Sequence, residues 1–393
     1  MAIDIEAVDG RSRGLRRRQE AVGAAGLVRR LDWLLLGAMF ATCGYGLLAI
    51  NGITRHDASG SALSRQATYS VVGLVVFVVA LAIDPDRYRR LHRPIYLGTL
   101  GVMLLVLAAG AATRGSKRWI GAGAFTLQPS EFGKVVFVLA LAGFLVQRSR
   151  DGNGFRTSLT LAAYGLAPIA LVFLQPDIGT ALVYTAALAA VLFVGGIRWS
   201  QLSILAAVAV AVALAVLWLL PAAGFNVLKP YQTARLTGFT HPSSDPSGAT
   251  YNLTQSITAV GAGGLRGRGV QNATQTRLDY LPEHATDFAF ASLAEQRGFF
   301  GVSVLLLLYL LIVWRGLKIV AGARDLYCAT VAGAIVFMFL FQVFVNCAMA
   351  MGIAPITGIP LPFVSVAGSS LVTNFLAFGV LQAINMRSRR RYA

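Results

Sequence analysis

The chain has 393 residues, of which 56% are hydrophobic and only 13% are charged, and its formal net charge is +17. Soluble globular proteins carry about 25% charged residues, so this composition excludes an ordinary soluble protein. The positive charge does not indicate a nucleic-acid-binding protein, because the arginines gather in the tails and in short links between apolar runs, and no nucleic-acid-binding motif is present. The composition instead predicts a polytopic membrane protein.

Ten apolar runs are long enough to cross a bilayer as helices. In chain order they are Trp33–Ile50, Ala67–Ile83, Pro94–Ala112, Glu131–Val146, Leu159–Leu174, Ile178–Ile197, Leu202–Leu220, Gly298–Trp314, Leu326–Ala350 and Ser369–Ile384. The predicted fold is therefore all-α, with ten transmembrane helices. Residues 31–386 form the transmembrane domain, which includes a long outer loop at 221–297 between spans seven and eight. An Arg-rich tail at 1–30 precedes this domain, and a basic tail at 387–393 follows it.

Lysine and arginine residues are concentrated in alternate links and in both tails. The positive-inside rule then places both termini in the cytoplasm, in a multi-pass protein of the cytoplasmic membrane. Four unusual segments fall on the opposite, outer face: 114–134, 175–177, the long loop that ends at Glu295, and 352–370. The residues best suited to chemistry are therefore predicted to lie outside the cell.

The stretch Leu281–Glu295 ends the long polar loop and contains Asp287 and a candidate substrate-binding residue, Glu283. Thr286 is a suitable helix N-cap, so we expect Asp287 to lie at the mouth of the following helix. Ionisable groups at the edge of a membrane are costly and usually functional. Alternatively, this acid only caps its helix and complements the helix dipole.

Three other outer segments carry candidate substrate-binding residues. Lys117 and Arg118 suit phosphate groups near a membrane surface, or are solvated loop charges. Glu131 and Lys134 are three positions apart on one helical face, where they either contact a substrate or form a buried ion pair. Asp177 precedes a span and either caps its helix or belongs to the site.

The remaining candidates are Arg235 in the long loop, and Ser365 and Ser369 in a Gly/Pro/Ser-rich segment. Uncharged backbone of this kind is tolerated at membrane depth where it lines a cavity. The four histidines are scattered and the three cysteines fall in predicted spans, so the sequence predicts no metal site.

Taken together, these motifs resemble the RodA/FtsW/SpoVE family of cell-wall polymerases, the SEDS proteins. The resemblance extends from the first span to the last and rests on Arg118-Trp119, Gln128–Lys134, Gln175–Thr180, Gln255–Gly264, Leu281–Gly298 and Gly358–Ser370. The run from Thr274 to Glu283 is most similar to the elongation-type RodA branch. Two departures concern local contacts: Val366-Ala367 stands where the family has an aromatic residue and a glycine, and an alanine separates His284 from Thr286.

The resemblance implies a peptidoglycan glycosyltransferase that polymerises lipid II at the outer face of the cytoplasmic membrane. The family's essential acid matches Asp287, which would act as general base on the acceptor hydroxyl. Lys117, Arg118, Lys134 and Arg235 would stabilise the leaving diphosphate. The growing glycan strand and a class B penicillin-binding protein, a transpeptidase, are the implied partners. No cofactor is predicted, and a divalent cation remains an open alternative.

Two other functions fit the sequence. Ten spans with intramembrane charges are also compatible with a lipid II flippase or another transporter of lipid-linked sugars. A scaffold for a partner enzyme is the third hypothesis.

Overall fold

The computed structural model describes residues 30–55, 61–109, 111–113, 116–122, 125–149, 154–224, 232–233 and 249–388. Most of the two predicted tails lies outside these ranges, as does Arg235. The division into tails and a membrane domain therefore stays a prediction.

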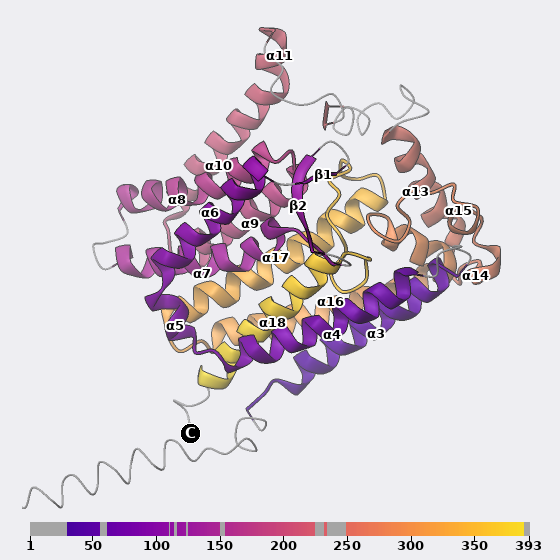
Figure 1. The fold of residues 1–393 in the computed structure, drawn as a ribbon, viewed down its shortest axis with the longest axis horizontal. Coiled ribbons are helices and arrows are strands. Elements are labelled where there is room, and N and C mark those ends of the chain that lie inside the picture. The colour runs from indigo at the N-terminus through magenta and orange to yellow at the C-terminus, as the bar shows by residue number, and fades with distance from the viewer. Residues whose placement is uncertain are drawn as a thin grey trace, which may run out of the picture.

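The described chain is mainly helical (Figure 1). Its helices are α3 (Trp33–Ile53), α4 (Ser61–Ala82), α5 (Pro85–Arg90), α6 (His92–Ala109), α7 (Pro129–Ser149), α8 (Phe155–Leu174), α9 (Ile178–Val194), α10 (Trp199–Leu214), the π-helix η1 (Ala215–Leu219), α11 (Leu220–Ala222), α13 (Ala249–Gly263), α14 (Gly269–Asn272), α15 (Thr274–Arg277), α16 (Ala289–Ala321), α17 (Leu326–Ala350) and α18 (Gly368–Ser388).

A small antiparallel sheet connects α6 to α7, in a segment that the sequence analysis treated as a loop. Its strands are β1 (Ala111–Thr113), β2 (Ser116–Ala122) and β3 (Phe125–Leu127), in the order β1-β2-β3. Pairing between these strands satisfies backbone polar groups next to the membrane, where unpaired groups are costly.

Within the described residues, eight helices are long and apolar enough to cross a membrane, and two shorter apolar helices cover His92–Ala108 and Ile178–Val194. These ten helices coincide with the ten apolar runs of the sequence. The expected polytopic helical fold is confirmed, whereas the number of ten crossings stays a prediction.

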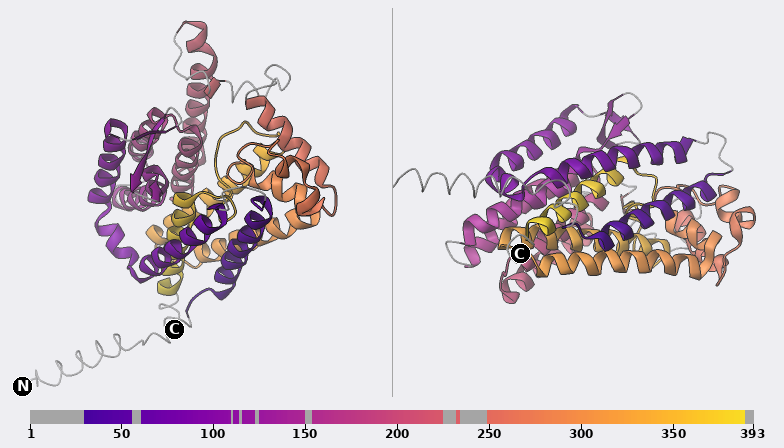
Figure 2. Two further views of the ribbon diagram at one scale, coloured as in Figure 1. Left: turned by 45° about the vertical axis from the view of Figure 1, so that its right-hand side comes forward. Right: turned by 90° about the horizontal axis from the view of Figure 1, so that it is seen from below.

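The core of the bundle is formed by α7, α17 and α18, which are the most buried of the long apolar helices. By contrast, no residue of the most apolar part of Trp199–Ala222 is buried. This helix, formed by α10, η1 and α11, stands away from the rest of the bundle in Figure 1 and in the left view of Figure 2. Its exposed apolar side chains are those expected of a surface that faces lipid.

The start of α3 and the end of α18 lie at the same end of the bundle. The Asp32 backbone exchanges two hydrogen bonds with the Gln382 amide, of 3.1 and 3.0 Å. Asn385 donates to the Arg30 carbonyl at 3.2 Å, and Arg315 forms an ion pair with Asp32. We call this end of the bundle the terminal end.

The eighth predicted span begins at Gly298, but the structure shows helix before that residue as well. Gly298 has φ 64° and ψ −165°, and it separates the first turns of α16 from the long membrane helix that follows. A side chain at this position would collide with the backbone of Gly267. The kink therefore requires glycine, because few other residues adopt this conformation.

Candidate active site

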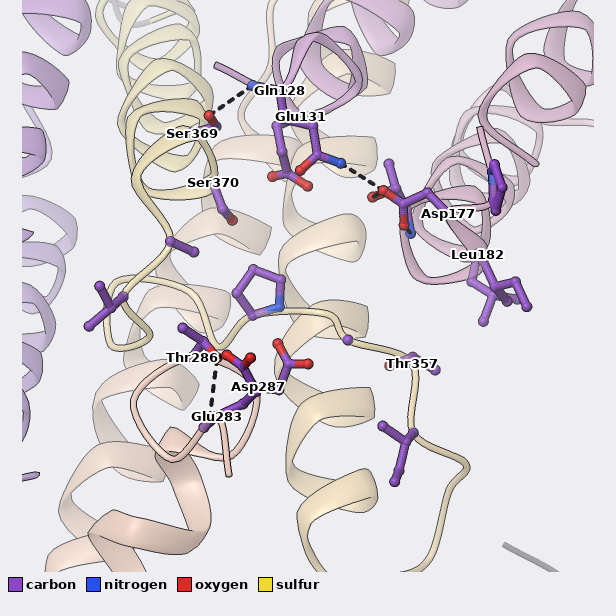
Figure 3. Close-up of a pocket in the computed structure, with 18 of the residues that line it drawn as sticks. Gln128, Glu131, Asp177, Leu182, Glu283, Thr286, Asp287, Thr357, Ser369 and Ser370 are labelled. Atoms are coloured by element: carbon purple, nitrogen blue, oxygen red, sulfur yellow. Dashed lines mark hydrogen bonds between the residues drawn. The ribbon is translucent and has the colours of Figure 1, made fainter. Parts of the chain in front are cut away.

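A cavity of about 540 Å³, drawn in Figure 3, is lined by residues at the start of α18, so it lies at the end of the bundle opposite the terminal end. Most of its lining comes from the four segments that the sequence predicted at the outer face, including Trp119, Asp177, Asp287 and Ser369. The helix α18 runs from this cavity, beginning at Gly368, to the terminal end at Ser388. Residues distant in the sequence thus meet at one site.

Asp287 lies in a series of turns just before α16 and is half-buried in the cavity wall. The expected N-cap at Thr286 is wrong: its hydroxyl donates instead to a carboxylate oxygen of Glu283, at 2.8 Å. The helix begins at Ala289, and Phe288 occupies the N-cap position without a side-chain capping bond. Local pairing between Thr286 and Glu283 has therefore replaced the helix cap.

The backbone on both sides of the cavity is tied together by one amide side chain. Asn346, which is fully buried in α17, donates to the Asp287 carbonyl at 2.9 Å and to the Ile359 carbonyl at 2.8 Å. A further bond runs from the Val366 amide to the Ala285 carbonyl, at 2.9 Å. These bonds hold Asp287 at a fixed place relative to the segment 352–370.

A second buried group supports the turns from the other side. Glu295 is 0% exposed, and its two carboxylate oxygens accept three hydrogen bonds. The donors are the Gln275 amide at 2.9 Å, the Thr276 amide at 3.0 Å and the Thr276 hydroxyl at 2.7 Å. Because the Leu281 amide donates to the Gln275 carbonyl at 3.1 Å, Glu295 anchors the backbone that leads into the Asp287 turns.

The opposite wall of the cavity is built by the starts of α7, α9 and α18, as Figure 3 shows. Gln128 joins these three elements: its side chain donates to Asp177 at 2.7 Å, and its backbone amide donates to the Ser369 hydroxyl at 3.0 Å. Asp177 is also the N-cap of α9, where it accepts from the Thr180 amide at 3.0 Å. Asp177 therefore caps its helix and lines the cavity as well.

Glu131 and Lys134 form an ion pair of 2.8 Å whose two side chains are only 6% and 2% exposed. Of the two alternatives that the sequence left open for these residues, the structure therefore contains the buried ion pair. Glu131 lines the cavity, whereas Lys134 lies behind it and is not among the lining residues. Each charge compensates the other in a place where an unpaired charge would be costly.

Ser365 stabilises the backbone of its own segment. Its hydroxyl accepts a 2.9 Å bond from the Leu361 amide, and its side chain does not line the cavity. Lys117 and Arg118 lie in β2, directly before the cavity residue Trp119, but their side chains are outside the described part of the chain. Arg235 is also outside it.

The structure adds residues that sequence reasoning did not select. Gln128 was part of a quoted motif, and Glu295 closed the Leu281–Glu295 stretch, but neither was assigned to the site. Asn346 carried one signal, an amide side chain within an apolar span, which it shares with Gln342. Among the described residues, no group of three or more acidic, histidine or cysteine side chains is placed to hold a metal ion.

Comparisons with known proteins find similarity along almost the whole chain. The FtsW/RodA/SpoVE family model, described as "Cell cycle protein", matches residues 29–390. The peptidoglycan glycosyltransferase MrdB of Escherichia coli K12 is 35% identical over 355 residues, which cover 90% of this chain and 93% of MrdB. Stage V sporulation protein E of Bacillus subtilis is 35% identical over 349 residues, covering 88% of this chain and 92% of that protein.

Two solved structures share the fold. A chain of a peptidoglycan synthase complex, described as coordinating polymerization and crosslinking, superposes with a TM-score of 0.76 and 29% identity, covering 92% of this chain and 98% of that one. The rod shape determining protein RodA of Thermus thermophilus gives a TM-score of 0.67 and 26% identity, covering 92% and 98%. The fold, the motifs around the cavity and these relatives lead to one conclusion: this chain belongs to the FtsW/RodA/SpoVE family.

Proposed function

We propose that this protein is a peptidoglycan glycosyltransferase that polymerises lipid II into glycan strands during cell elongation. Relatives named peptidoglycan glycosyltransferase MrdB and RodA support this activity. The observation that carries the proposal is the placement of Asp287 at the wall of the cavity, where buried hydrogen bonds fix its backbone. Lipid II has a disaccharide-peptide head and an undecaprenyl diphosphate anchor, so its sugar can enter such a cavity while its anchor stays in lipid.

The reaction transfers the glycan from an undecaprenyl diphosphate to a sugar hydroxyl. The acceptor hydroxyl loses a proton as it attacks the anomeric carbon, and the diphosphate leaves with the electron pair of the broken bond. Asp287 would accept that proton as general base. Lys117, Arg118 and Arg235 would stabilise the charge that develops on the diphosphate. Lys134 would act only through Glu131, because Glu131 lines the cavity and Lys134 lies behind it.

The backbone conformation near Asp287 is further evidence for a functional site with a fixed geometry. Glu283 has φ 55°, a left-handed conformation that residues other than glycine rarely adopt. Such residues cost about 1–3 kcal/mol and gather at functional sites when their surroundings hold them in place. Here the Thr286 hydroxyl holds the Glu283 carboxylate, and both residues line the cavity.

The proposal places this cavity on the outer side of the cytoplasmic membrane and both termini in the cytoplasm. Charge distribution supports this orientation, because arginine-rich links and tails belong to the terminal end. A class B penicillin-binding protein is the proposed partner, since the similar peptidoglycan synthase complex couples polymerization with crosslinking.

The test is glycan synthesis by the purified protein in vesicles that contain labelled lipid II, with and without the partner and divalent cations. Polymer that forms from lipid II supports the proposal. Movement of lipid II between leaflets without polymer would contradict it and identify a transporter. Polymer that forms only when the transpeptidase-inactive form of the partner is present would support a polymerase that the partner activates.

A further inference from the structure

A second cavity, of about 380 Å³, lies between α6, α7 and α8. Its polar lining consists of Arg93, Gln147 and Arg148, and its apolar lining includes Tyr96, Phe144 and Tyr164. This cavity belongs to no part of the proposed polymerisation site, which lies at the other end of α7.

The position of the second cavity follows from its helices. Arg93 is the second residue of α6, and Arg148 is the next-to-last residue of α7. The short helix α5, which leads into α6, is held at the terminal end by ion pairs of Arg89 with Asp325 and of Arg324 with Asp86. The second cavity therefore opens at the terminal end, which the charge distribution places at the inner leaflet.

Within the described residues, nothing compensates the positive charge of this cavity. Arg93 and Arg148 are exposed, and neither forms an ion pair or a side-chain hydrogen bond with another residue in the described chain. The described lining contains no acidic side chain. Two guanidinium groups at one cavity mouth attract an anion, and their planar forks suit phosphate oxygens.

The floor of the cavity is aromatic and held in place. Phe144 and Tyr164 stack with ring centroids 4.4 Å apart and an interplanar angle of 10°. The Tyr96 ring meets the Phe144 ring edge-on at 5.4 Å, while its hydroxyl donates to the Tyr164 carbonyl at 2.8 Å. These rings line the same cavity as the two arginines and offer apolar surface to glycerol and the first acyl carbons.

We propose that this cavity binds the phosphate and glycerol of an anionic phospholipid from the inner leaflet. Basic pockets between transmembrane helices at the cytoplasmic side are suited to phospholipid head groups. An anionic head group is favoured over a zwitterionic one, because the described lining offers no acid to pair with a head-group ammonium. The proposal does not depend on glycosyltransferase activity.

The test compares three variants with the wild-type protein by native mass spectrometry in detergent. The probes are phosphatidylglycerol, phosphatidylcholine and inorganic phosphate, whose adducts differ in mass. Arg93→Gln/Arg148→Gln removes both cavity charges, and Arg93→Lys/Arg148→Lys keeps the charges but removes the planar forks. The control, Arg87→Gln/Arg90→Gln, removes two charges from exposed residues of α5 outside the cavity.

We expect one retained phosphatidylglycerol on the wild-type protein and on the control, and at least tenfold weaker retention on the glutamine variant. The lysine variant should retain phosphatidylglycerol more weakly than the wild type. Equal losses in the glutamine variant and the control would show only a diffuse surface charge and overturn the proposal. Retention of inorganic phosphate or phosphatidylcholine as strong as that of phosphatidylglycerol would also overturn it. Melting temperatures without lipid check that each variant is folded.

Discussion

Glu295→Gln is the substitution that most sharply tests how the Asp287 turns are held. The carboxylate accepts three bonds with two oxygens, whereas an amide has one oxygen and one NH2 group. In either orientation the NH2 group faces a backbone amide that can only donate. The variant therefore loses at least one bond to a charged group, which contributes about 1.5–3 kcal/mol. Since 1.4 kcal/mol corresponds to a factor of ten, opening of the segment around Gln275 and Thr276 should become about 10- to 150-fold more frequent.

Hydrogen exchange of the amides of Gln275, Thr276 and Leu281 measures this opening directly. We expect faster exchange in this segment, unchanged exchange in α17, and lower polymerisation activity. The matched control is Asp279→Asn, which neutralises a 74% exposed carboxylate in the same loop and keeps a residue type that tolerates positive φ. Exchange that is unchanged by Glu295→Gln, or equally accelerated by the control, would refute the anchoring role.

The remaining predictions concern other buried polar contacts. Lys134→Met should destabilise the protein by about 3–5 kcal/mol, because it leaves Glu131 buried without its partner. Adding Glu131→Gln should recover much of that loss of stability, measured by thermal unfolding. If the double variant recovers no stability, the pairing is contradicted. Asn346→Ala should lower the free energy of unfolding by about 2–4 kcal/mol, because two buried carbonyls lose their hydrogen-bond donor. It should lower the polymerisation rate more than the affinity for lipid II. Unchanged activity would argue against a positioning role. Asp32→Asn should weaken the contact with Arg315 and lower the melting temperature, while polymerisation at low temperature stays unaffected. An unchanged melting temperature would contradict a structural role for this pair.

The sequence predicted the helices well because a membrane span must be both apolar and long. Leu326–Ala350 was predicted with the same first and last residue as α17, and α3 and α9 also begin where expected. The predicted positions of helix ends in aqueous links were less accurate. The helix α4 begins at Ser61, six positions before the predicted Ala67. Polar residues at a helix start carry little hydropathy signal, so the apolar run marks only the membrane part of the helix.

The site was predictable as a set of segments but not as a set of contacts. Alternating the spans placed Asp177, Asp287 and Ser369 on one face, and the structure brings them to one cavity. The N-cap rule failed at Thr286, because its hydroxyl donates to the Glu283 carboxylate instead of accepting from a backbone amide of the helix. The contact of Asn346 with Asp287 spans 59 positions, and no local pattern specifies it.

The most direct test of the central claim is glycan polymerisation from lipid II by purified Asp287→Asn protein. The substitution keeps the size of the side chain and the backbone bond from Asn346, but it removes the basic carboxylate. We predict a folded protein with a wild-type melting temperature that forms no polymer, while Asp279→Asn, measured in parallel, continues to polymerise. Polymer made by Asp287→Asn at the wild-type rate would contradict the assignment of this carboxylate as the general base.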